Sequence, residues 1–367
     1  MHQNTPLLRA LRCPQNLISL TAAEWNLCLP QARRARVLGR LGVLLNEQGL
    51  LQQLPEKMRE HLDAARAVSS LHERTVRWEV NRLERVLAHL NAPVVLLKGA
   101  AYVMAGLPPA RGRLYSDVDI LVPKERLAEV ESTLLTKGWE TTRPDRYDQR
   151  YYRIWMHELP PLQHSERMTA LDVHHAILPE TGRLHPDSAL LLDSAQFVSG
   201  TCFKVLAPAD MILHSAAHMF QDGELAGSLR DLTDLDDLLR YFGGRDGFWE
   251  ELVTRARRLG LLRPLFYALH YAQQILDTPV RPAVQVAVKK AGGPPALVLH
   301  IMDALVDRAL VPTASENASG TAGLARWLLY IRSHWLRMPP LLLTRHLFQK
   351  SLRRRSLEPD RPQPNQP

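Results

Sequence analysis

The stretch Tyr115-Ser116-Asp117-Val118-Asp119-Ile120-Leu121-Val122 decides how the rest of this chain is interpreted. Two carboxylates two residues apart alternate with apolar side chains, so Asp117 and Asp119 share one face of a strand while Val118 and Ile120 point into a core. Two strand residues rise about 6.6 Å, which lets both carboxylates reach one divalent cation or a close pair of cations. Because two unpaired carboxylates would repel each other, we expect something positive between them, and Mg²⁺ with a nucleotide phosphate is the usual solution.

A third carboxylate lies in a second expected strand, residues 170–176. Asp172 stands between apolar neighbours and repeats the alternation of the first pair, and by the period of two His174 shares its face. Three carboxylates from neighbouring strands form an all-oxygen site suited to Mg²⁺ or Mn²⁺. The alternative is that each aspartate caps a turn or pairs with an arginine. That reading suits a lone aspartate better than this group.

Composition indicates a globular protein. The chain has 367 residues, 46% of them hydrophobic and 23% charged, which allows two domains and argues against a disordered chain. Its apolar runs stay short of the ~20 residues of a membrane-spanning helix, and residues 1–15 lack the apolar core of a signal peptide. The three cysteines are Cys13, Cys28 and Cys202. They have no paired spacing, which favours a reducing, cytoplasmic location.

The pattern along the chain predicts an α+β protein in which a small mixed β-sheet core is flanked by helical N-terminal and C-terminal regions. We expect a helical region at residues 1–90, with Thr21 and Glu24 as a capping box, an α/β core at 91–205, a helical domain at 206–355 and a disordered tail at 356–367. Within the core we expect strands at 94–97 and 151–156 and helices at 100–105 and 125–137. In the C-terminal region we expect helices at 209–220, 229–242, 248–259, 262–276, 296–310 and 324–352, the last interrupted at Pro339-Pro340.

Three segments together resemble a known superfamily. Lys98-Gly99, then Ser116 to Val122, then Leu171-Asp172-Val173-His174 are similar to the nucleotidyltransferases related to DNA polymerase β, and more closely to a poorly characterised bacterial branch with a Lys-Gly…Asp-x-Asp signature. The resemblance covers residues 93–177, about a quarter of the chain. It implies that Asp117 and Asp119 bind metal ions and that Asp172 completes the second metal site and helps to activate a hydroxyl. The implied reaction is in-line attack of that hydroxyl on the α-phosphate of a nucleoside triphosphate, which releases pyrophosphate.

The chain departs from this superfamily at one position. A Gly-Ser pair usually precedes the first aspartate, whereas Gly99 is followed here by Ala100, so the hydroxyl that would touch the phosphates is missing. Lys98, the backbone amides of the next helix, or Ser116 could take its place. The alternative function is therefore a catalytically degenerate, nucleotide-binding regulatory protein.

Several basic residues are candidates for phosphate binding. Lys98 stands where a strand enters a turn, and the loop before the aspartate strand contains two arginines that could bind the β- and γ-phosphates; both features also suit a solvated surface. His174 either borders the site or is a partly buried structural histidine. The nucleotide-binding candidates are Lys98, Gly99, Ser116, Arg111, Arg113 and His174.

Two further groups of residues stay open. His214 and His218 lie four residues apart on one expected helix, and Asp231 and Asp234 three apart on another. They could form a second metal site or contact the nucleotide base, but hydrogen bonds between the helices explain them without a metal and are the favoured reading. Aromatic residues and arginines at helical spacing within 324–352 suggest peripheral contact with a membrane or a partner protein, while the core face of a terminal helix is the simpler reading.

The acceptor is not visible in the sequence and could be a protein, a sugar, a small molecule or RNA. The net charge of +8 suggests affinity for something anionic, but a basic run such as Arg353-Arg354-Arg355 is more often a solvated surface than a nucleic-acid site. Binding to nucleic acid is possible, and no aromatic-and-basic recognition motif supports it. The identity of the nucleoside triphosphate is also open.

Overall fold

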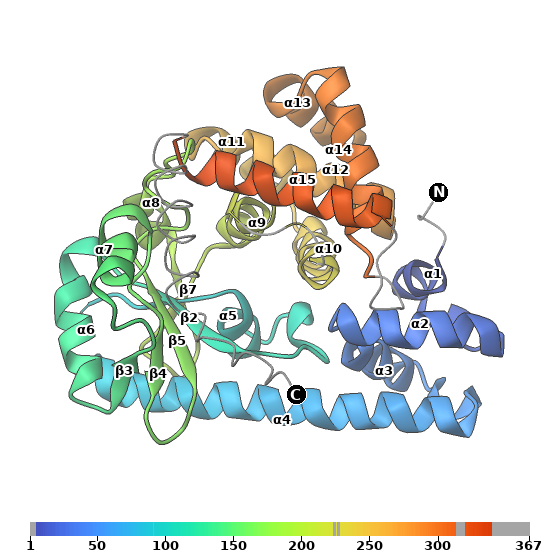
Figure 1. Cartoon of the computed structure of the whole chain (residues 1–367), viewed down its shortest axis with the longest axis horizontal. Coiled ribbons are helices and arrows are strands. Elements are labelled where there is room, and N and C mark those ends of the chain that lie inside the picture. The colour runs from blue at the N-terminus through green and yellow to red at the C-terminus, as the bar shows by residue number, and fades with distance from the viewer. Residues whose placement is uncertain (1–4, 91, 223–224, 226–227, 313–319, 340–367) are drawn as a thin grey trace, which may run out of the picture.

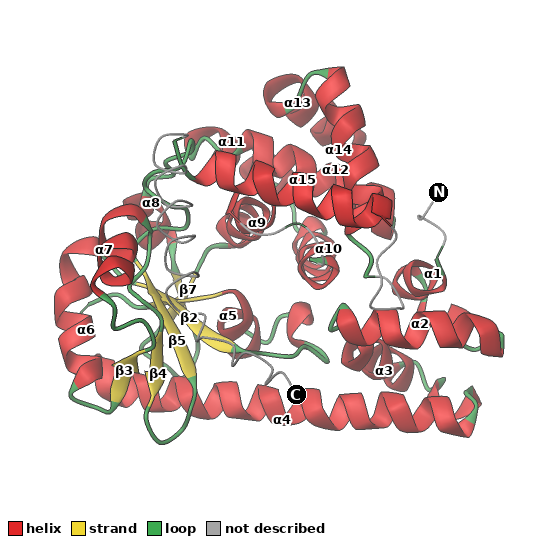
Figure 2. Ribbon diagram, viewed as in Figure 1, coloured by secondary structure: helices red, strands yellow, loops and turns green. Residues whose placement is uncertain are grey.

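The computed structural model describes residues 5–90, 92–222, 225, 228–312 and 320–339. A mixed seven-stranded sheet is covered by helices from both ends of the chain, which confirms the expected α+β class (Figure 2). The strand order is β3-β4-β5-β2-β1-β7-β6. The strands are β1 (Val95–Leu97), β2 (Asp117–Leu121), β3 (Trp139–Thr141), β4 (Leu162–His164), β5 (Ala170–His174), β6 (Gln196–Phe197) and β7 (Lys204–Val205).

Strand β2 occupies the centre of the sheet because its aliphatic residues need burial on both sides. It runs antiparallel to β1 and parallel to β5, and Val118, Ile120 and Leu121 are at most 1% exposed. Strands buried on both faces read as continuous apolar runs, as the segment from Ile120 onward does. The predicted strands at 94–97, 115–122 and 170–176 are therefore confirmed.

The N-terminal region is helical. Thr21 accepts a hydrogen bond from the Glu24 amide, and the Glu24 carboxylate accepts one from the Thr21 amide, so the predicted capping box is present. The helices are α1 (Pro6–Arg12), α2 (Ala22–Arg34), α3 (Leu38–Glu47) and α4 (Glu56–Leu87). Helix α4 passes along the sheet, and α1, α2 and α3 lie over the far end of α4, away from the strands (Figure 1).

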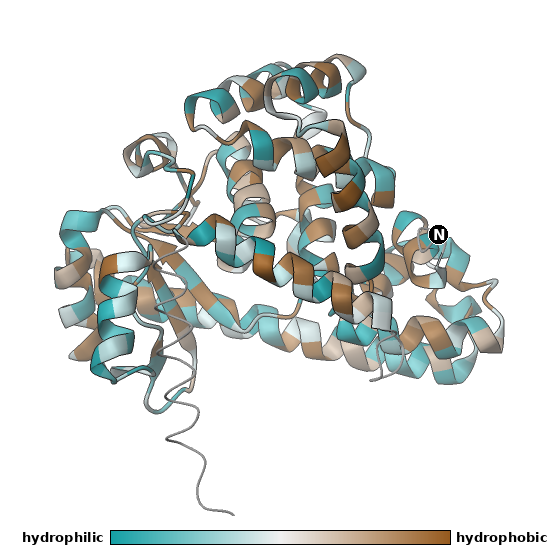
Figure 3. Ribbon diagram, turned by 45° about the horizontal axis from the view of Figure 1, so that its top comes forward, coloured by the Kyte–Doolittle hydropathy of each residue, from teal (hydrophilic) through white to brown (hydrophobic). Residues whose placement is uncertain are grey.

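Helix α4 lies beneath both the sheet and the other N-terminal helices (Figure 1). Its 32 residues span about 48 Å at 1.5 Å per residue. Buried side chains recur along it at spacings of three, four or seven residues and form one largely apolar stripe that faces the protein. This stripe consists of Leu62, Ser69, Val76, Val80, Leu83 and Leu87. Figure 3 shows the resulting alternation of hydrophobic and hydrophilic residues along the ribbon.

Four helices belong to the α/β part: α5 (Lys98–Met104), α6 (Leu127–Leu135), α7 (Arg146–Trp155) and α8 (Ser188–Ser194). The predicted strand at 151–156 is wrong, because these residues continue helix α7. The Asp145 side chain accepts hydrogen bonds from the amides of Tyr147 and Asp148 and so begins the helix. Tyr151 and Trp155, four residues apart, then pack edge to face.

The C-terminal helices lie on the side of the sheet opposite α4 (Figure 1). They confirm the helices expected from residue 209 to 310 and include one helix, α13, that was not expected. The elements are α9 (Pro208–Ala217), the π-helix η7 (His218–Asp222), α10 (Leu229–Gly243), α11 (Phe248–Arg258), α12 (Leu262–Leu276), α13 (Pro282–Gly292) and α14 (Ala296–Ala309). The last described helix, α15 (Gly320–Arg337), falls in the expected final segment. The continuation to residue 352 and the tail at 356–367 lie outside the described residues.

Several ion pairs connect the parts of the chain. Arg167 in the β4–β5 hairpin donates two hydrogen bonds to the fully buried carboxylate of Glu79 on α4. Two further pairs join α3 and the β2 loop to α10: Arg40 with Asp237, and Arg113 with Asp234. Among the described helices, none is both long enough and apolar enough to cross a bilayer.

Candidate active site

The site forms where β1 ends beside β2. Leu97 pairs in register with Asp119, so the next residue, Lys98, stands directly over the aspartate strand. Its ammonium lies 3.0 Å from Asp119 Oδ1. Lys98 begins helix α5 with a φ of 42°, a left-handed conformation that is strained for a residue with a side chain. The positive group beside Asp119 in this structure is therefore the lysine.

The strand register brings the three carboxylates to one face of the sheet. Asp119 pairs with Asp172 across the parallel strands β2 and β5, and such neighbours point to the same side about 4.8 Å apart. Asp117 shares that side because it stands two residues from Asp119. The third acid is thus adjacent to the first two.

The acids differ in their electrostatic surroundings. Burial raises the pKa of Asp119, but the charge of Lys98 and a hydrogen bond from His174 lower it by more than burial raises it. The pKa of Asp119 is therefore below its usual range. Asp117 and Asp172 have raised pKa values, first because of burial and then because of the charge of Asp119. For Asp172 the pKa rises from 3.8 to about 7. Grouped carboxylates with raised pKa values are typical of sites that bind cations or move protons.

A histidine cluster that the sequence did not indicate adjoins the acids. His174 Nε2 lies 3.1 Å from Asp119 Oδ1, and its Nδ1 lies 3.2 Å from Glu158 Oε2. The ring of His157 stacks at a tilt against the ring of His174, with 5.2 Å between centroids. His157 and Glu158 were missed because they follow the segment expected to be a strand, and only the tertiary fold brings them to His174.

A cleft opens beside Asp117 and Asp119, lined by α5 and β2 on one side and by α9, η7 and α10 on the other. Its free volume is about 140 Å³. Polar and charged side chains dominate its walls: Lys98, Arg113, Ser116, Asp117, Asp119, Ser215, His218, Arg230, Asp231 and Asp234, with Gly99 and Tyr102.

Arg113 fixes one wall of this cleft. Its guanidinium lies 2.9 Å from Asp234 Oδ2 on α10, and both side chains are at most 10% exposed. Burial lowers the pKa of the Arg113 guanidinium, but the charge of Asp234 raises it by more than burial lowers it. The guanidinium therefore stays charged. A Cβ on Gly99 would lie 2.6 Å from Arg113 Nη1 and 2.8 Å from a ring carbon of Tyr115, which explains why the residue after Lys98 is a glycine.

The predicted site residues are distributed unevenly. The cleft walls include Lys98, Gly99, Ser116 and Arg113, together with two of the acids. Asp172 and His174 belong to β5 and lie next to Asp119 of β2, but they are not part of the cleft walls. Arg111 is not brought to the cleft, because its exposed side chain pairs with Glu47 at 3.2 Å.

Of the four predicted residues of the helical domain, three line this cleft and His214 does not: His218, Asp231 and Asp234. Asp234 pairs with Arg113, and Asp231 pairs with Arg230 at 2.8 Å. His214 is buried in α9, and burial followed by the charge of Lys98 lowers its pKa well below the usual value. Among the described residues, the group whose ligand atoms come close enough for a metal ion is His157, Glu158 and His174.

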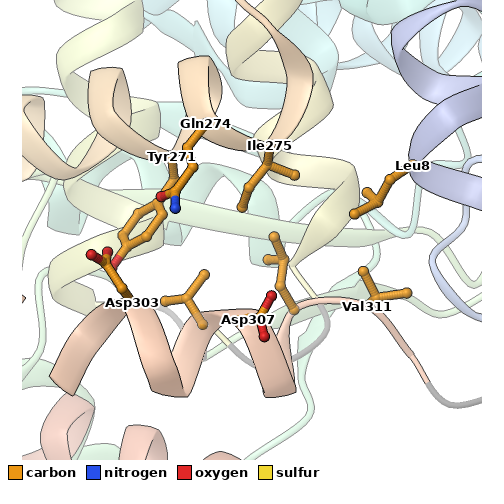
Figure 4. A pocket seen from close by; sticks show the side chains of 9 residues that line it. Leu8, Tyr271, Gln274, Ile275, Asp303, Asp307 and Val311 are labelled. Atoms are coloured by element: carbon orange, nitrogen blue, oxygen red, sulfur yellow. The ribbon is translucent and has the colours of Figure 1, made fainter. Parts of the chain in front are cut away.

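Other hollows lack this chemistry. A larger one, of about 460 Å³, is lined by Lys124, His175, Glu180 and His185 among others, and none of the three acids belongs to it. A small one, of about 20 Å³, lies between α1, α12 and α14 (Figure 4). Leu8, Ile275 and Val311 make it largely apolar, and it has room for little more than one water.

The three aspartates present the kind of donor atom that a hard divalent cation prefers. Asp117, Asp119 and Asp172 offer oxygen ligands, and the two contacts that restrain Asp119 both fall on Oδ1. Among the described residues, no hydrogen bond reaches Asp119 Oδ2. The donor set is therefore compatible with Mg²⁺ or Mn²⁺.

A mixed sheet with an Asp-x-Asp strand, a third aspartate on the adjacent strand and a Lys-Gly turn above them defines the nucleotidyltransferase class of site. The family model of uncharacterised nucleotidyltransferases matches residues 21–277, and the chain belongs to this family. The match includes the N-terminal helices from α2 onward and the helical domain through α12, far beyond the motif-bearing quarter. Searches of curated proteins and of solved structures give no match.

Proposed function

We propose that the protein transfers a nucleoside monophosphate from a nucleoside triphosphate to a hydroxyl group and releases pyrophosphate. The observation that carries this proposal is the pairing of Asp119 with Asp172 in the sheet, which puts three carboxylates on one side beside a cleft lined by both acidic and basic side chains. Family membership supports the reaction class.

Asp117, Asp119 and Asp172 would hold Mg²⁺ or Mn²⁺. When bound, such ions neutralise charge on the triphosphate and favour ionisation of the attacking hydroxyl. The residues of the chain contribute the rest. Lys98 and Arg113 line the cleft and would donate hydrogen bonds that orient the phosphates.

Asp172 is suited to proton transfer. Its carboxylate is a base that can accept the proton of an attacking hydroxyl. Because Asp119 is held ionised by Lys98 and His174, the two acids have different roles on adjacent strands. We assign charge stabilisation to Asp119 and proton acceptance to Asp172.

The test is release of pyrophosphate from labelled nucleoside triphosphates incubated with a cell extract and Mg²⁺. We expect an acceptor to become labelled by the wild type and labelling to fall by at least about a hundredfold in Asp117→Asn/Asp119→Asn. Undiminished labelling by a folded double variant would eliminate the proposal.

The second candidate is a nucleotide-binding regulatory protein without turnover. It is favoured by Ala100, which replaces the usual serine, and by the direct Lys98–Asp119 contact, which satisfies part of the charge that a metal ion would neutralise. Calorimetric binding of a nucleoside triphosphate with Mg²⁺, but without pyrophosphate release, would favour this function.

We also propose a surface contact for α15 and a cytoplasmic location. The net charge of +8 complements an anionic membrane surface. Helix α15 exposes large apolar side chains that could enter such a surface: Leu324, Trp327, Tyr330, Ile331 and Trp335. Anionic vesicles should sediment the wild type but not Trp327→Ala, with Leu27→Ala on α2 as the exposed control. Concentration-dependent dimerisation lost in Trp327→Ala would show that a second copy covers this face instead.

A further inference from the structure

The His157–Glu158–His174 cluster has the geometry of a metal site of its own. Each residue offers one ligand atom, and these atoms all lie within 4.8 Å of one another. His157 and His174 are buried, and the Glu158 side chain is 16% exposed. Two imidazoles and one carboxylate are the ligand set of many zinc sites.

The backbone holds the cluster in place. Glu158 forms an isolated antiparallel bridge with His174, and the amide of Leu159 donates to the carbonyl of Val173 at 2.9 Å. The carbonyl of His157 accepts from the amide of His175, also at 2.9 Å. Three ligands on two such joined segments need little reorganisation to close around an ion.

We propose that His157, Glu158 and His174 bind a transition-metal ion of the zinc type, separate from the Mg²⁺ or Mn²⁺ of the three aspartates. His174 would ligate through Nδ1 while its opposite nitrogen donates to Asp119 Oδ1, 3.1 Å away. Metal-bound histidines commonly donate their second N–H to a carboxylate, which fixes the tautomer and the ring. The ion thereby orients His174, and through it Asp119, without touching the substrate.

Ligand chemistry distinguishes the two sites. The aspartates present only oxygen, which Mg²⁺ prefers, whereas imidazole nitrogens select zinc, cobalt or nickel. Mg²⁺ should therefore compete poorly for the histidine cluster. This inference concerns metal binding alone and does not rest on nucleotidyl transfer.

The experiment uses the full chain freed of metal with a chelator and titrated with Co²⁺ in excess Mg²⁺. We expect one equivalent to bind with visible d–d absorption and to be displaced by Zn²⁺. Glu158→Gln and His157→Ala should weaken binding by about tenfold or more. The exposed His89→Ala is the matched control, because the chain has 15 histidines that could bind cobalt weakly.

Two results would overturn the inference: displacement of Co²⁺ by Mg²⁺, or equal affinity of the wild type and Glu158→Gln. Glu158→Gln keeps the shape of the side chain, so it remains informative even if His157→Ala fails to fold. Asp117→Asn separates this inference from the proposed function. That variant should bind Co²⁺ normally while losing Mg²⁺-dependent nucleotide binding.

Discussion

At the scale of single residues, Asp172 predicts how stability depends on pH. Its pKa is raised from 3.8 to about 7 by burial and then by the charges of Asp119 and Glu158. The folded state therefore binds a proton that the unfolded state has lost between these two values. The stability that this proton provides is complete below about pH 4 and disappears as the pH rises through about 7.

Asp172→Asn, which resembles the protonated acid, should stabilise the protein only above the pH at which the acid of the unfolded chain ionises. We expect a gain on the order of 1–3 kcal/mol at about pH 8.5, a smaller gain at about pH 5.5 and almost none at about pH 3.5. Thermal unfolding at the three pH values measures the difference. An equal effect of the substitution at all three would show that the acid titrates normally.

Gly99 allows the close packing of the Lys-Gly turn. Its missing Cβ leaves room for Arg113 and the Tyr115 ring, so Gly99→Ala should cost about 1–3 kcal/mol and weaken nucleotide binding by displacing Arg113. Gly244→Ala is the control, because a Cβ there meets nothing within 4 Å. Urea unfolding of both variants gives the comparison, and similar small losses would refute this role of Gly99.

At the scale of secondary-structure elements, the Arg113–Asp234 pair connects the loop before β2 to α10. Asp234→Ala should destabilise the protein by about 3–5 kcal/mol, because it leaves a charged guanidinium buried without its partner. Glu47→Ala removes the exposed Arg111–Glu47 pair and should cost less than about 1 kcal/mol. Chemical denaturation measures both, and equal losses would mean that Arg113 gains other partners.

Periodicity predicted the elements whose burial follows a simple repeat. The alternation around Asp119 and Asp172 indicated both strands and the side they share, because a period of two fixes the face of every residue. It failed at 151–156, where Tyr, Ile and Trp favour strands by intrinsic propensity. There the Asp145 cap and the packing of Tyr151 on Trp155 stabilise a helix instead.

The candidate site was predictable only where motif residues are local in sequence. Lys98, Asp117 and Asp119 stand within 22 positions and meet through the pairing of β1 with β2. Arg113 and Asp234 are separated by 121 positions, and Glu158 reaches His174 through one isolated bridge. Such contacts depend on how the helical domain docks and where a loop joins the sheet, which neither propensity nor spacing encodes.

At the scale of the whole molecule, largely buried ion pairs join each region to both of the others. Arg167 and Glu79 connect the core at 91–205 to the helices at 1–90. Arg113 and Asp234 connect that core to the helical domain beginning at 206. Arg40 and Asp237 connect the first region to the third. A continuous hydrophobic cluster, with members from Leu7 to Leu329, accompanies these links.

Because each region is held by both of the others, we expect the chain to unfold in urea as one cooperative unit. Buried tryptophans lie in each region: Trp25, Trp139 and Trp249. Their fluorescence, far-UV circular dichroism and hydrogen-exchange protection of α2, β2 and α11 should all change at one urea concentration. Asp237→Ala should lower that midpoint while the signals still coincide, because the other links and the shared core remain. Separate transitions in the wild type would instead make 1–90, 91–205 and 206–355 independent domains.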